Sequence, residues 1–461
     1  MLEGVLYKPV VNHEKCNTCG ICLGYCPAEI VREFRQEEDS LRAKVYKYRG
    51  IDKKLDSEII LPPCQLICPI GQDIRGYIRL IAEGKDAEAL KLIRETNALP
   101  SVTSYVCSRP CESECLRNAL EGPVALRALK RFITDLDDGK LQPLPVGKRN
   151  GKKVGVIGSG PAGLAAAYDL VRMGFSVTVF ESMPLPGGML RYGIPEYRLP
   201  RNILDKDVEY IKALGVEIRT NTPITDVDQL IQHYQAIILA NGTWSNRHLG
   251  ISDEDTQGIY HSLRFLKDIN SGIAVNLGNR VVVVGGGNAA LDAARVSKRL
   301  GVKDVTILYR RSEAEMPALT EEIIEAKEEG IKLNVLASPV KFIISNGKLS
   351  GLYCIRMKLG EVDASGRLQP IPIKDSEFTI STDNIIIAIG ERVDRATLPK
   401  NISCTNNDTI SVNPGTLETN IKAVFAAGDA VNGPTNIVEA LASAKKVASS
   451  VEKYMGVLFT S

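Results

Sequence analysis

The chain has 461 residues, of which 44% are hydrophobic and 24% charged, a composition typical of a globular protein with about three domains. A formal net charge of +2 gives no reason to expect a nucleic acid or an anionic membrane as partner. No apolar run approaches the roughly 20 residues of a membrane span, and residues 1–5 lack the basic start and apolar core of a signal peptide. We therefore expect a cytoplasmic protein, where clustered cysteines bind metal more often than they form disulfides.

Nine of the eleven cysteines lie within the first 115 residues, and they fall into two groups. The first group has the spacing of a bacterial ferredoxin, in which thiolates hold an iron–sulfur cluster. A zinc site or reduced structural thiols are the alternatives, but zinc usually takes two CxxC pairs. Residues 1–50 are thus predicted to form a ferredoxin-like [4Fe–4S] module. The first group is Cys16, Cys19, Cys22 and Cys26, and the second is Cys64, Cys68, Cys107, Cys111 and Cys115.

Apolar side chains at helical spacing predict a helical domain over residues 51–145, ending in a linker rich in Pro, Gly and Lys. Beyond it, β-branched runs alternate with helical runs, which indicates a parallel α/β architecture. None of the four histidines is closely paired in the sequence, so a histidine-rich metal site is not expected. The predicted strands are Lys153–Ile157, Ser176–Phe180, Ala236–Leu239, Arg280–Val284, Asp304–Leu308, Asn384–Ile389 and Ala423–Ala426.

A glycine fingerprint follows the first of these strands. Its first glycine permits a tight turn, its second lets the backbone approach a pyrophosphate, and its third lets the helix pack on the strand. The helix N-terminus then faces the phosphates, and Glu181, at the end of the next strand, is placed to meet a ribose hydroxyl. A turn without a ligand is the alternative. The fingerprint consists of Gly158, Gly160, Pro161, Ala162 and Gly163.

A second fingerprint begins after the strand at 280–284. Its next strand ends in Arg310 and Arg311, where an NAD site would carry an acid. Because guanidinium groups pair with a 2′-phosphate, NADPH is favoured over NADH; the alternative is that both arginines are solvated surface charges. The residues expected at the nucleotide are Gly285, Gly287, Asn288 and Ala289, together with the two arginines.

Together, the second cysteine group and the fingerprints resemble the glutamate synthase small-subunit family, which includes dihydropyrimidine dehydrogenase. The resemblance also rests on residues 97–100 and 128–132 and runs from about residue 60 to the end. Two departures stand out: the family usually has two more cysteines just upstream of the position of Cys64, and it often has a Glu or Gln ligand near the position of Lys130.

The resemblance implies an FAD site completed by three later segments. Asp429 would bond the ribityl chain, and the helix after it would direct its N-terminus at the isoalloxazine, although Gly428 and Asp429 could also form an ordinary turn. The FAD-binding domain would then be discontinuous, with residues 151–265 and 386–461, and a NAD(P)H-binding domain, 266–385, would be inserted. The implied flavin residues are Gly188, Met189, Leu190, Arg191, Gly193, Ile194, Asn241, Gly242, Gly428, Asp429 and Thr435.

The same resemblance divides the cysteines between two [4Fe–4S] clusters. Cys68, Cys107 and Cys111 would form the core of one cluster, whose fourth ligand is open. The core of the other cluster would be Cys16, Cys19 and Cys22, while Cys26, Cys64 and Cys115 compete for the remaining places.

We therefore expect an α/β oxidoreductase subunit that passes electrons between NADP or NAD, FAD, two clusters and a partner. The partner would be ferredoxin or another redox subunit, such as an aldehyde or 2-oxoacid oxidoreductase. A glutamate synthase small subunit, whose partner is the large subunit, is the alternative within the class. A non-catalytic scaffold or assembly protein is the alternative outside it, and the intact fingerprints argue against that.

Overall fold

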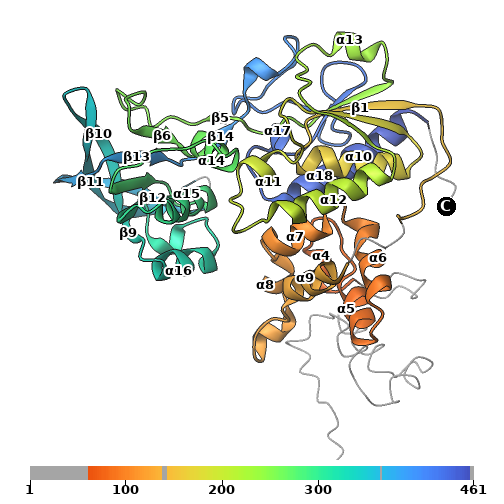
Figure 1. Ribbon diagram of the computed structural model, residues 1–461, viewed down its shortest axis with the longest axis horizontal. Helices are drawn as coiled ribbons and strands as arrows, with labels where there is room; N and C mark the ends of the chain where they lie inside the picture. The colour runs from red at the N-terminus through yellow and green to blue at the C-terminus, as the bar shows by residue number, and fades with distance from the viewer. Residues whose placement is uncertain (1–60, 138–142, 364–365, 457–461) are drawn as a thin grey trace, which may run out of the picture.

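A computed structural model describes residues 61–137, 143–363 and 366–456. These residues form a helical region and two α/β regions, one on each side of a crossing connection (Figure 1). The predicted α/β class is confirmed by two five-stranded sheets whose strand pairs are parallel. The ferredoxin-like module predicted for residues 1–50 lies outside the described residues.

The helical region owes its packing to apolar side chains spaced one helical turn apart. Ile74, Tyr77, Leu90 and Ile93 are buried in one cluster together with Ile133, which is the amphipathic pattern that the sequence predicted. Its helices are α4 (Pro63–Leu66), α5 (Ile74–Ala82), α6 (Asp86–Thr96), α7 (Pro100–Val106), α8 (Pro110–Ser113), the short 3-10 helix η1 (Leu116–Ala119) and α9 (Leu126–Leu136).

The first α/β region has the strand order β15-β4-β1-β2-β3. Its central strands are apolar runs buried on both faces, as expected when helices cover both sides of a parallel sheet. The last strand and the last helix come from the end of the chain, so this region is discontinuous. The elements are β1 (Lys153–Ile157), α10 (Pro161–Arg172), β2 (Ser176–Phe180), α11 (Met189–Tyr192), α12 (Arg201–Ala213), β3 (Glu217–Arg219), α13 (Asp228–Ile231), β4 (Ala236–Leu239), β15 (Val424–Ala426), α17 (Asp429–Asn432) and α18 (Ile437–Tyr454).

The second α/β region has the strand order β6-β13-β7-β8-β9, and an antiparallel meander, β10-β11-β12, extends from it. Its edge strand β6 begins at Ile259, before the predicted start of this domain at residue 266. Strand β13 also belongs to this sheet, although residue 386 was predicted to begin the second part of the FAD-binding domain. The elements are β6 (Ile259–His261), α14 (Ser262–Asn270), β7 (Arg280–Val284), α15 (Asn288–Arg299), β8 (Asp304–Tyr309), η2 (Glu313–Glu315), α16 (Thr320–Glu328), β9 (Lys332–Val335), β10 (Ala337–Ser345), β11 (Lys348–Val362), β12 (Leu368–Ser381) and β13 (Asn384–Ile387).

The chain crosses between the two α/β regions twice, and the two crossing segments pair with each other. β5 (Ser245–Asn246) on the way out lies antiparallel to β14 (Glu391–Arg392) on the way back, and the short helix η3 (Arg395–Thr397) follows. The connection is therefore a two-stranded ribbon rather than two separate linkers.

The helical region is anchored on the first α/β region by a buried polar network. The N–H of Val102 donates to Asp207 at 2.9 Å, and the guanidinium of Arg94 lies 3.5 Å from the same carboxylate. Tyr168 of α10 donates to the carbonyl of Arg94 at 2.5 Å. Because buried polar groups are costly unless paired, this network fixes the cysteine-bearing helices against α10 and α12.

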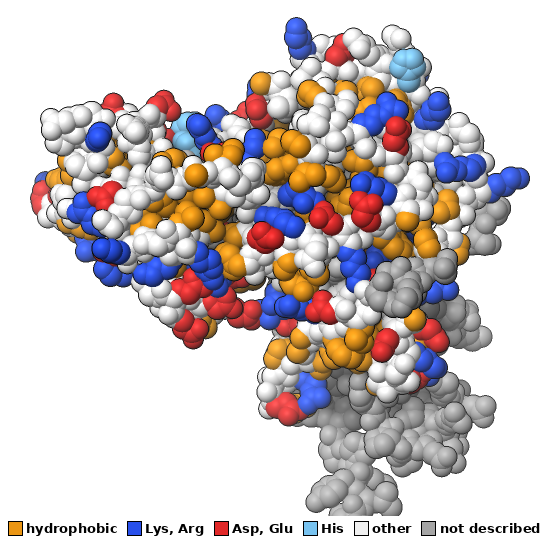
Figure 2. Space-filling view, in the orientation of Figure 1, with side chains coloured by type: hydrophobic (Ala, Val, Ile, Leu, Met, Phe, Trp, Pro, Cys, Tyr) orange, Lys and Arg blue, Asp and Glu red, His pale blue; other side chains and the backbone are white. Residues whose placement is uncertain are grey.

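On the face shown in Figure 2, basic and acidic side chains are mixed, and acidic ones gather where Figure 1 places the glutamate-rich helix α16. Within the described residues, no helix is long and apolar enough to span a bilayer.

Candidate functional site

The first glycine loop has the shape that a dinucleotide site requires. Gly158 has φ 102°, and a Cβ there would lie 2.4 Å from the carbonyl oxygen of Ala240. A Cβ on Gly163 would lie 1.9 Å from the carbonyl oxygen of Gly158, so helix and strand are in close contact. At Gly160, by contrast, a Cβ would meet no described atom of the chain within 4 Å. The chain itself thus demands glycine at the first and third positions, while the second faces open space, which fits a pyrophosphate.

Glu181 lies at the end of β2, beside this loop, and is buried. One of its carboxylate oxygens accepts hydrogen bonds from the N–H and the hydroxyl of Ser159, at 3.0 and 2.5 Å. The other accepts from the N–H of Met183 at 2.8 Å. These bonds hold the carboxylate at the loop, which is where the sequence predicted a partner for a ribose hydroxyl.

Two of the implied flavin segments converge on this loop, beside the third, whose Ala240 carbonyl contacts Gly158. The N–H of Gly187 donates to Ser159, and a Cβ on Gly188 would lie 2.8 Å from the Cα of Gly160. From the end of the chain, a Cβ on Gly428 would lie 2.6 Å from the Cβ of Ala162. Segments near residues 158, 188 and 428 thus form one cradle, and its close approaches explain the glycines.

Not every implied flavin residue presents its side chain to this cradle. Leu190 is fully buried in the core, and the guanidinium of Arg191 binds the Pro186 carbonyl at 2.6 Å and the carboxylate of Asp205. Both therefore support the loop. Asn241 donates to the Thr397 carbonyl at 3.3 Å, and its amide oxygen is buried without a hydrogen-bond partner in the described part of the chain.

The carboxylate of Asp429 accepts hydrogen bonds from the hydroxyl and the N–H of Thr435, at 2.7 and 3.2 Å. Burial raises the pKa of Asp429, and these two hydrogen bonds oppose the shift. The other implied flavin residues lie in the same segments, namely Pro161, Met189, Gly193, Ile194, Gly242 and Gly428.

The second glycine loop repeats the geometry of the first. A Cβ on Gly285 would lie 2.1 Å from the carbonyl oxygen of Ala388, whereas one on Gly287 would come no closer than 3.9 Å to any described atom, a carbon of Pro317. Asn288 and Ala289 begin α15, and the side chain of Asn288 accepts from the N–H of Leu319 at 3.1 Å.

The two arginines after β8 differ sharply in environment. Arg310 is exposed. Arg311 is buried, and its guanidinium donates to the carboxylate of Asp363 at 2.5 Å and to the carbonyl of Leu368 at 2.8 Å. The guanidinium of Arg311 thus already binds residues next to and in the meander of β10, β11 and β12. Of this pair, Arg310 is the residue whose charge is available to a nucleotide.

Cys68, Cys107 and Cys111 line one small cavity in the helical region. Burial raises the pKa of the Cys111 thiol to about 12; the neighbouring thiols of Cys107 and Cys68 add to the shift, and Lys130 opposes it. A thiolate here needs positive charge beyond that of Lys130, and iron supplies such charge. The donor set therefore fits an iron–sulfur cluster.

Gln72 and Lys130 line the same cavity. The Lys130 ammonium donates to the Thr103 hydroxyl at 3.1 Å and, having no lone pair when protonated, cannot ligate iron. Gln72 is 4% exposed, and within the described residues neither its amide oxygen nor its amide nitrogen has a hydrogen-bond partner. A buried amide without partners is costly, so this side chain is a candidate for the open ligand position.

The other two cysteines of the helical region, Cys64 and Cys115, are not among the residues that line this cavity. Burial raises the pKa of the Cys64 thiol, and Cys115 adds to the shift. Cys64 packs in the same apolar cluster as Cys111, so it lies beside the thiols of the cavity. Cys16, Cys19, Cys22 and Cys26 lie outside the described residues, whereas Cys354 is buried, as expected of a structural thiol.

The N-terminus of α18 joins the flavin cradle to the thiol cavity. Asn436 caps this helix by accepting the N–H of Glu439 at 3.1 Å. Val438, in its first turn, lines the cavity of Cys68, Cys107 and Cys111. A single segment, residues 428–438, thus runs from the glycine loop to the thiols.

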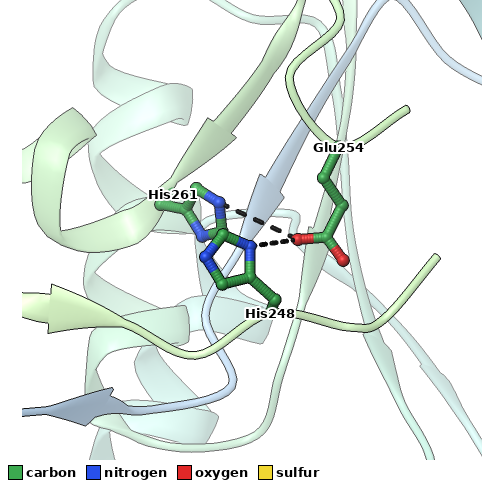
Figure 3. Close-up of side chains that lie close together, drawn as sticks. All are labelled: His248, Glu254 and His261. Carbon is green, nitrogen blue, oxygen red and sulfur yellow. Dashed lines mark hydrogen bonds and ion pairs between the residues drawn. The ribbon is translucent and has the colours of Figure 1, made fainter. Parts of the chain in front are cut away.

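One constellation was not expected from the sequence. His248, Glu254 and His261 lie together beside the crossing connection, although thirteen positions separate the two histidines in the chain (Figure 3). Their ligand atoms all lie within 4.8 Å of one another. The spacing, five and six residues between neighbours, has no recognised metal signature, and the fold of the intervening loop brings them together.

Comparison with known families matches two parts of the chain. The model described as pyridine nucleotide-disulphide oxidoreductase matches residues 152–444, and that described as dihydropyrimidine dehydrogenase domain II, 4Fe-4S cluster, matches residues 59–140. Both confirm the predicted resemblance.

Several characterised proteins are similar over most of the chain. The NADP(+)-dependent formate dehydrogenase subunit beta of Moorella thermoacetica is 40% identical over 86% of this chain, which spans 60% of that protein. The NADPH-Fe(3+) oxidoreductase subunit beta of Geobacter sulfurreducens is 35% identical over 93% of this chain and 68% of its own length. The glutamate synthase [NADPH] small chain of Escherichia coli is 33% identical over 86% and 89%.

Among solved structures, Mycobacterium tuberculosis FprA in complex with NADPH is similar in fold. The TM-score is 0.58 at 19% sequence identity, over 66% of this chain and 85% of FprA. At this identity the likeness concerns the fold alone.

Proposed function

Because the chain belongs to the pyridine nucleotide-disulphide oxidoreductase family and is an FAD- and NAD(P)-dependent iron–sulfur oxidoreductase, we propose that it carries electrons between NADPH and a partner redox protein. When bound, FAD exchanges hydride with the nicotinamide and releases electrons singly to the clusters. The chain supplies binding, orientation and a short connection between the two kinds of site.

The observation that carries this proposal is the position of α18. Gly428 touches the first glycine loop at Ala162, and Val438, ten residues later, lines the thiol cavity. The proposed flavin and cluster sites would therefore both adjoin residues 428–438, a segment that holds α17 and the start of α18. This proximity favours electron transfer over a scaffold role, since a scaffold has no need of it.

We assign the binding roles by element. The cradle of the first α/β region would hold FAD, with Glu181 toward the ribose and Asp429 toward the ribityl chain. The loop at Gly285 and Gly287 would hold the nicotinamide nucleotide, with Arg310 toward the 2′-phosphate. The relatives' names, which specify NADP or NADPH, support this choice.

For the metal, we propose that Cys68, Cys107 and Cys111 bind one [4Fe–4S] cluster whose fourth ligand is the amide oxygen of Gln72. Three converging thiols and a buried amide without a partner support this set. Cys16, Cys19 and Cys22 would then hold the second cluster, with Cys26, Cys64 or Cys115 in its fourth place. Lys130 would remain a neighbouring positive charge.

The partner is proposed by analogy with the relatives, two of which are named as beta subunits of a formate dehydrogenase and an Fe(3+) oxidoreductase. A second redox subunit of that kind, or ferredoxin, fits an exit through single electrons. The proposed compartment is the cytoplasm, where the clustered thiols would stay reduced. A glutamate synthase small subunit remains the second candidate, because the Escherichia coli chain matches over 89% of its length.

The test is anaerobic purification followed by metal, flavin and activity assays. We expect about eight irons per chain, the number in two [4Fe–4S] clusters, with FAD and with NADPH-dependent reduction of a viologen dye. Co-purification of the native protein with its tightest partner separates the two candidates, since an amidotransferase subunit would indicate glutamate synthase. Stoichiometric zinc in place of iron, or flavin that NADPH does not reduce, would refute the proposal.

A further inference from the structure

His248, Glu254 and His261 present three ligand atoms to one point. Nδ1 of His248 lies 2.8 Å from Oε2 of Glu254, and Nε2 of His261 lies 4.0 Å from the same oxygen. The centroids of the two imidazole rings are 5.0 Å apart, and the rings meet edge to face. Figure 3 shows the carboxylate directed at both rings, which come from separate segments.

The hydrogen bonding of these groups is incomplete. Both ring nitrogens of His261 are buried and, within the described residues, make no hydrogen bond. The Glu254 side chain is 8% exposed, and its other oxygen accepts the N–H of Ile251 at 3.4 Å, which orients the carboxylate. Two buried ring nitrogens without hydrogen-bond partners in the described chain, beside an oriented carboxylate, are unfavourable unless something binds them.

We propose that these three residues bind a zinc ion. Two imidazoles and a carboxylate are a ligand set that zinc takes with water in the fourth position. With ligand bonds of about 2.0–2.1 Å, tetrahedral geometry places neighbouring ligand atoms roughly 3.3 Å apart. The observed 2.8 and 4.0 Å lie on either side of that value, so small rotations of the side chains complete the site. His248, which is 54% exposed, leaves a path for the metal.

The place of the site in the fold gives it a structural role. His248 lies just after β5, in the crossing ribbon, whereas His261 is the last residue of β6, the edge strand of the second sheet. Glu254 lies in the loop between them. A metal here would fasten the outgoing crossing segment to the nicotinamide region and so fix the orientation of that region toward the flavin cradle.

Zinc binding by the whole, iron-loaded protein tests the proposal. After EDTA treatment, the protein is equilibrated with zinc buffered at a series of free concentrations, and bound zinc is measured. Wild type should bind about one zinc per chain. His248→Asn and Glu254→Gln should each weaken binding by at least about tenfold, since even the loss of an outer partner has that effect. His233→Asn is the matched control, because His233 is exposed on another loop.

Two further measurements separate this site from the thiols. X-ray absorption at the zinc edge should show nitrogen and oxygen ligands without sulfur. Zinc should also slow hydrogen exchange in residues 249–258 of wild type but not of His261→Asn. Sulfur ligands, or equal zinc binding by wild type and by the variants His248→Asn, Glu254→Gln and His261→Asn, would overturn the proposal.

Discussion

The sulfur of Cys107 accepts a hydrogen bond from the backbone N–H of Arg109 at 3.4 Å, and Arg109 holds a left-handed backbone, φ 60°, at that point. Backbone N–H groups that point at sulfur stabilise the negative charge of a thiolate and its cluster. A non-glycine residue in this conformation costs about 1 kcal/mol or more and persists where the surrounding structure requires it. The strain thus lies where the proposed cluster needs an N–H donor.

Substitution of Arg109 separates the backbone requirement from the side chain. Arg109→Gly should retain the cluster, because glycine adopts positive φ freely. Arg109→Val should lose about half of the iron, because a β-branched residue resists that conformation. Iron content and visible absorbance measure both outcomes. Equal iron in the two variants would show that the turn does not hold the sulfur.

The proposed division of the cysteines between two clusters predicts that their variants fall into two classes. Cys107→Ser and Cys19→Ser should each remove about half of the iron, and each should abolish a different signal in the electron paramagnetic resonance spectrum of the reduced protein. The flavin should be retained in both variants. Loss of the same signal in both Cys107→Ser and Cys19→Ser would contradict the division.

Substitutions of Gln72 and of Lys130 should have different effects on the cluster, because only Gln72 is proposed to occupy the open ligand position. Gln72→Ala should release one iron and give a three-iron signal in the oxidised protein, whereas Gln72→Glu, which keeps an oxygen ligand, should retain four irons. Lys130→Met should keep the four-iron cluster and lower its reduction potential, because a nearby positive charge is lost. An intact four-iron spectrum in Gln72→Ala, with a shifted potential, would make Gln72 a hydrogen-bond donor instead.

The central parallel strands could be predicted from sequence because each is a short apolar run buried on both faces, whereas the more exposed edge strands β3, β6 and β9 were not predicted. Lys153–Ile157, Ser176–Phe180 and Arg280–Val284 form strands with the predicted bounds. The meander of β10, β11 and β12 was not predicted, since its long strands are exposed on one side and mix Lys with apolar residues. Periodicity is weak in such strands, and pairing with neighbours determines them.

The candidate site was predictable where backbone shape dictates residue type, and less so where side chains choose among partners. The glycines at 158, 163 and 285 are required by carbonyl contacts that any such turn makes. By contrast, Arg311 is unavailable to a nucleotide because it binds Asp363, which is 52 residues away in the chain. Gln72 and the His248 constellation depend on packing in the same way, and no local pattern marks them.

Two glycines of the first loop should respond differently to the same substitution. Gly160→Val should fold and lack FAD, because its Cβ meets no described atom of the chain and stands where a pyrophosphate would lie. Gly163→Val should misfold, because its Cβ would overlap the Gly158 carbonyl oxygen at 1.9 Å. Flavin absorbance and thermal melting distinguish the outcomes. Full flavin content in folded Gly160→Val would show that this loop is not the FAD site.

Nucleotide choice should depend on Arg310 and not on Arg311. Arg310 is exposed at the end of β8, and a guanidinium is the usual partner of a dianionic 2′-phosphate. Losing a charged hydrogen-bond partner costs about 1.5–3 kcal/mol, or roughly tenfold to a hundredfold in affinity. Arg310→Ala should therefore raise the apparent dissociation constant for NADPH by that factor and leave the dissociation constant for NADH nearly unchanged.

Arg311→Ala should instead lower the stability of the fold, and it should change the apparent affinities for NADPH and NADH by the same factor. Its guanidinium is buried between Asp363 and the Leu368 carbonyl, so its loss should cost about 2 kcal/mol of stability. Steady-state reduction of a viologen dye by NADPH and by NADH, in wild type and both variants, gives the comparison, and thermal melting gives the stability. If Arg310→Ala weakens both nucleotides equally, or if wild type prefers NADH, the phosphate is held elsewhere or not at all.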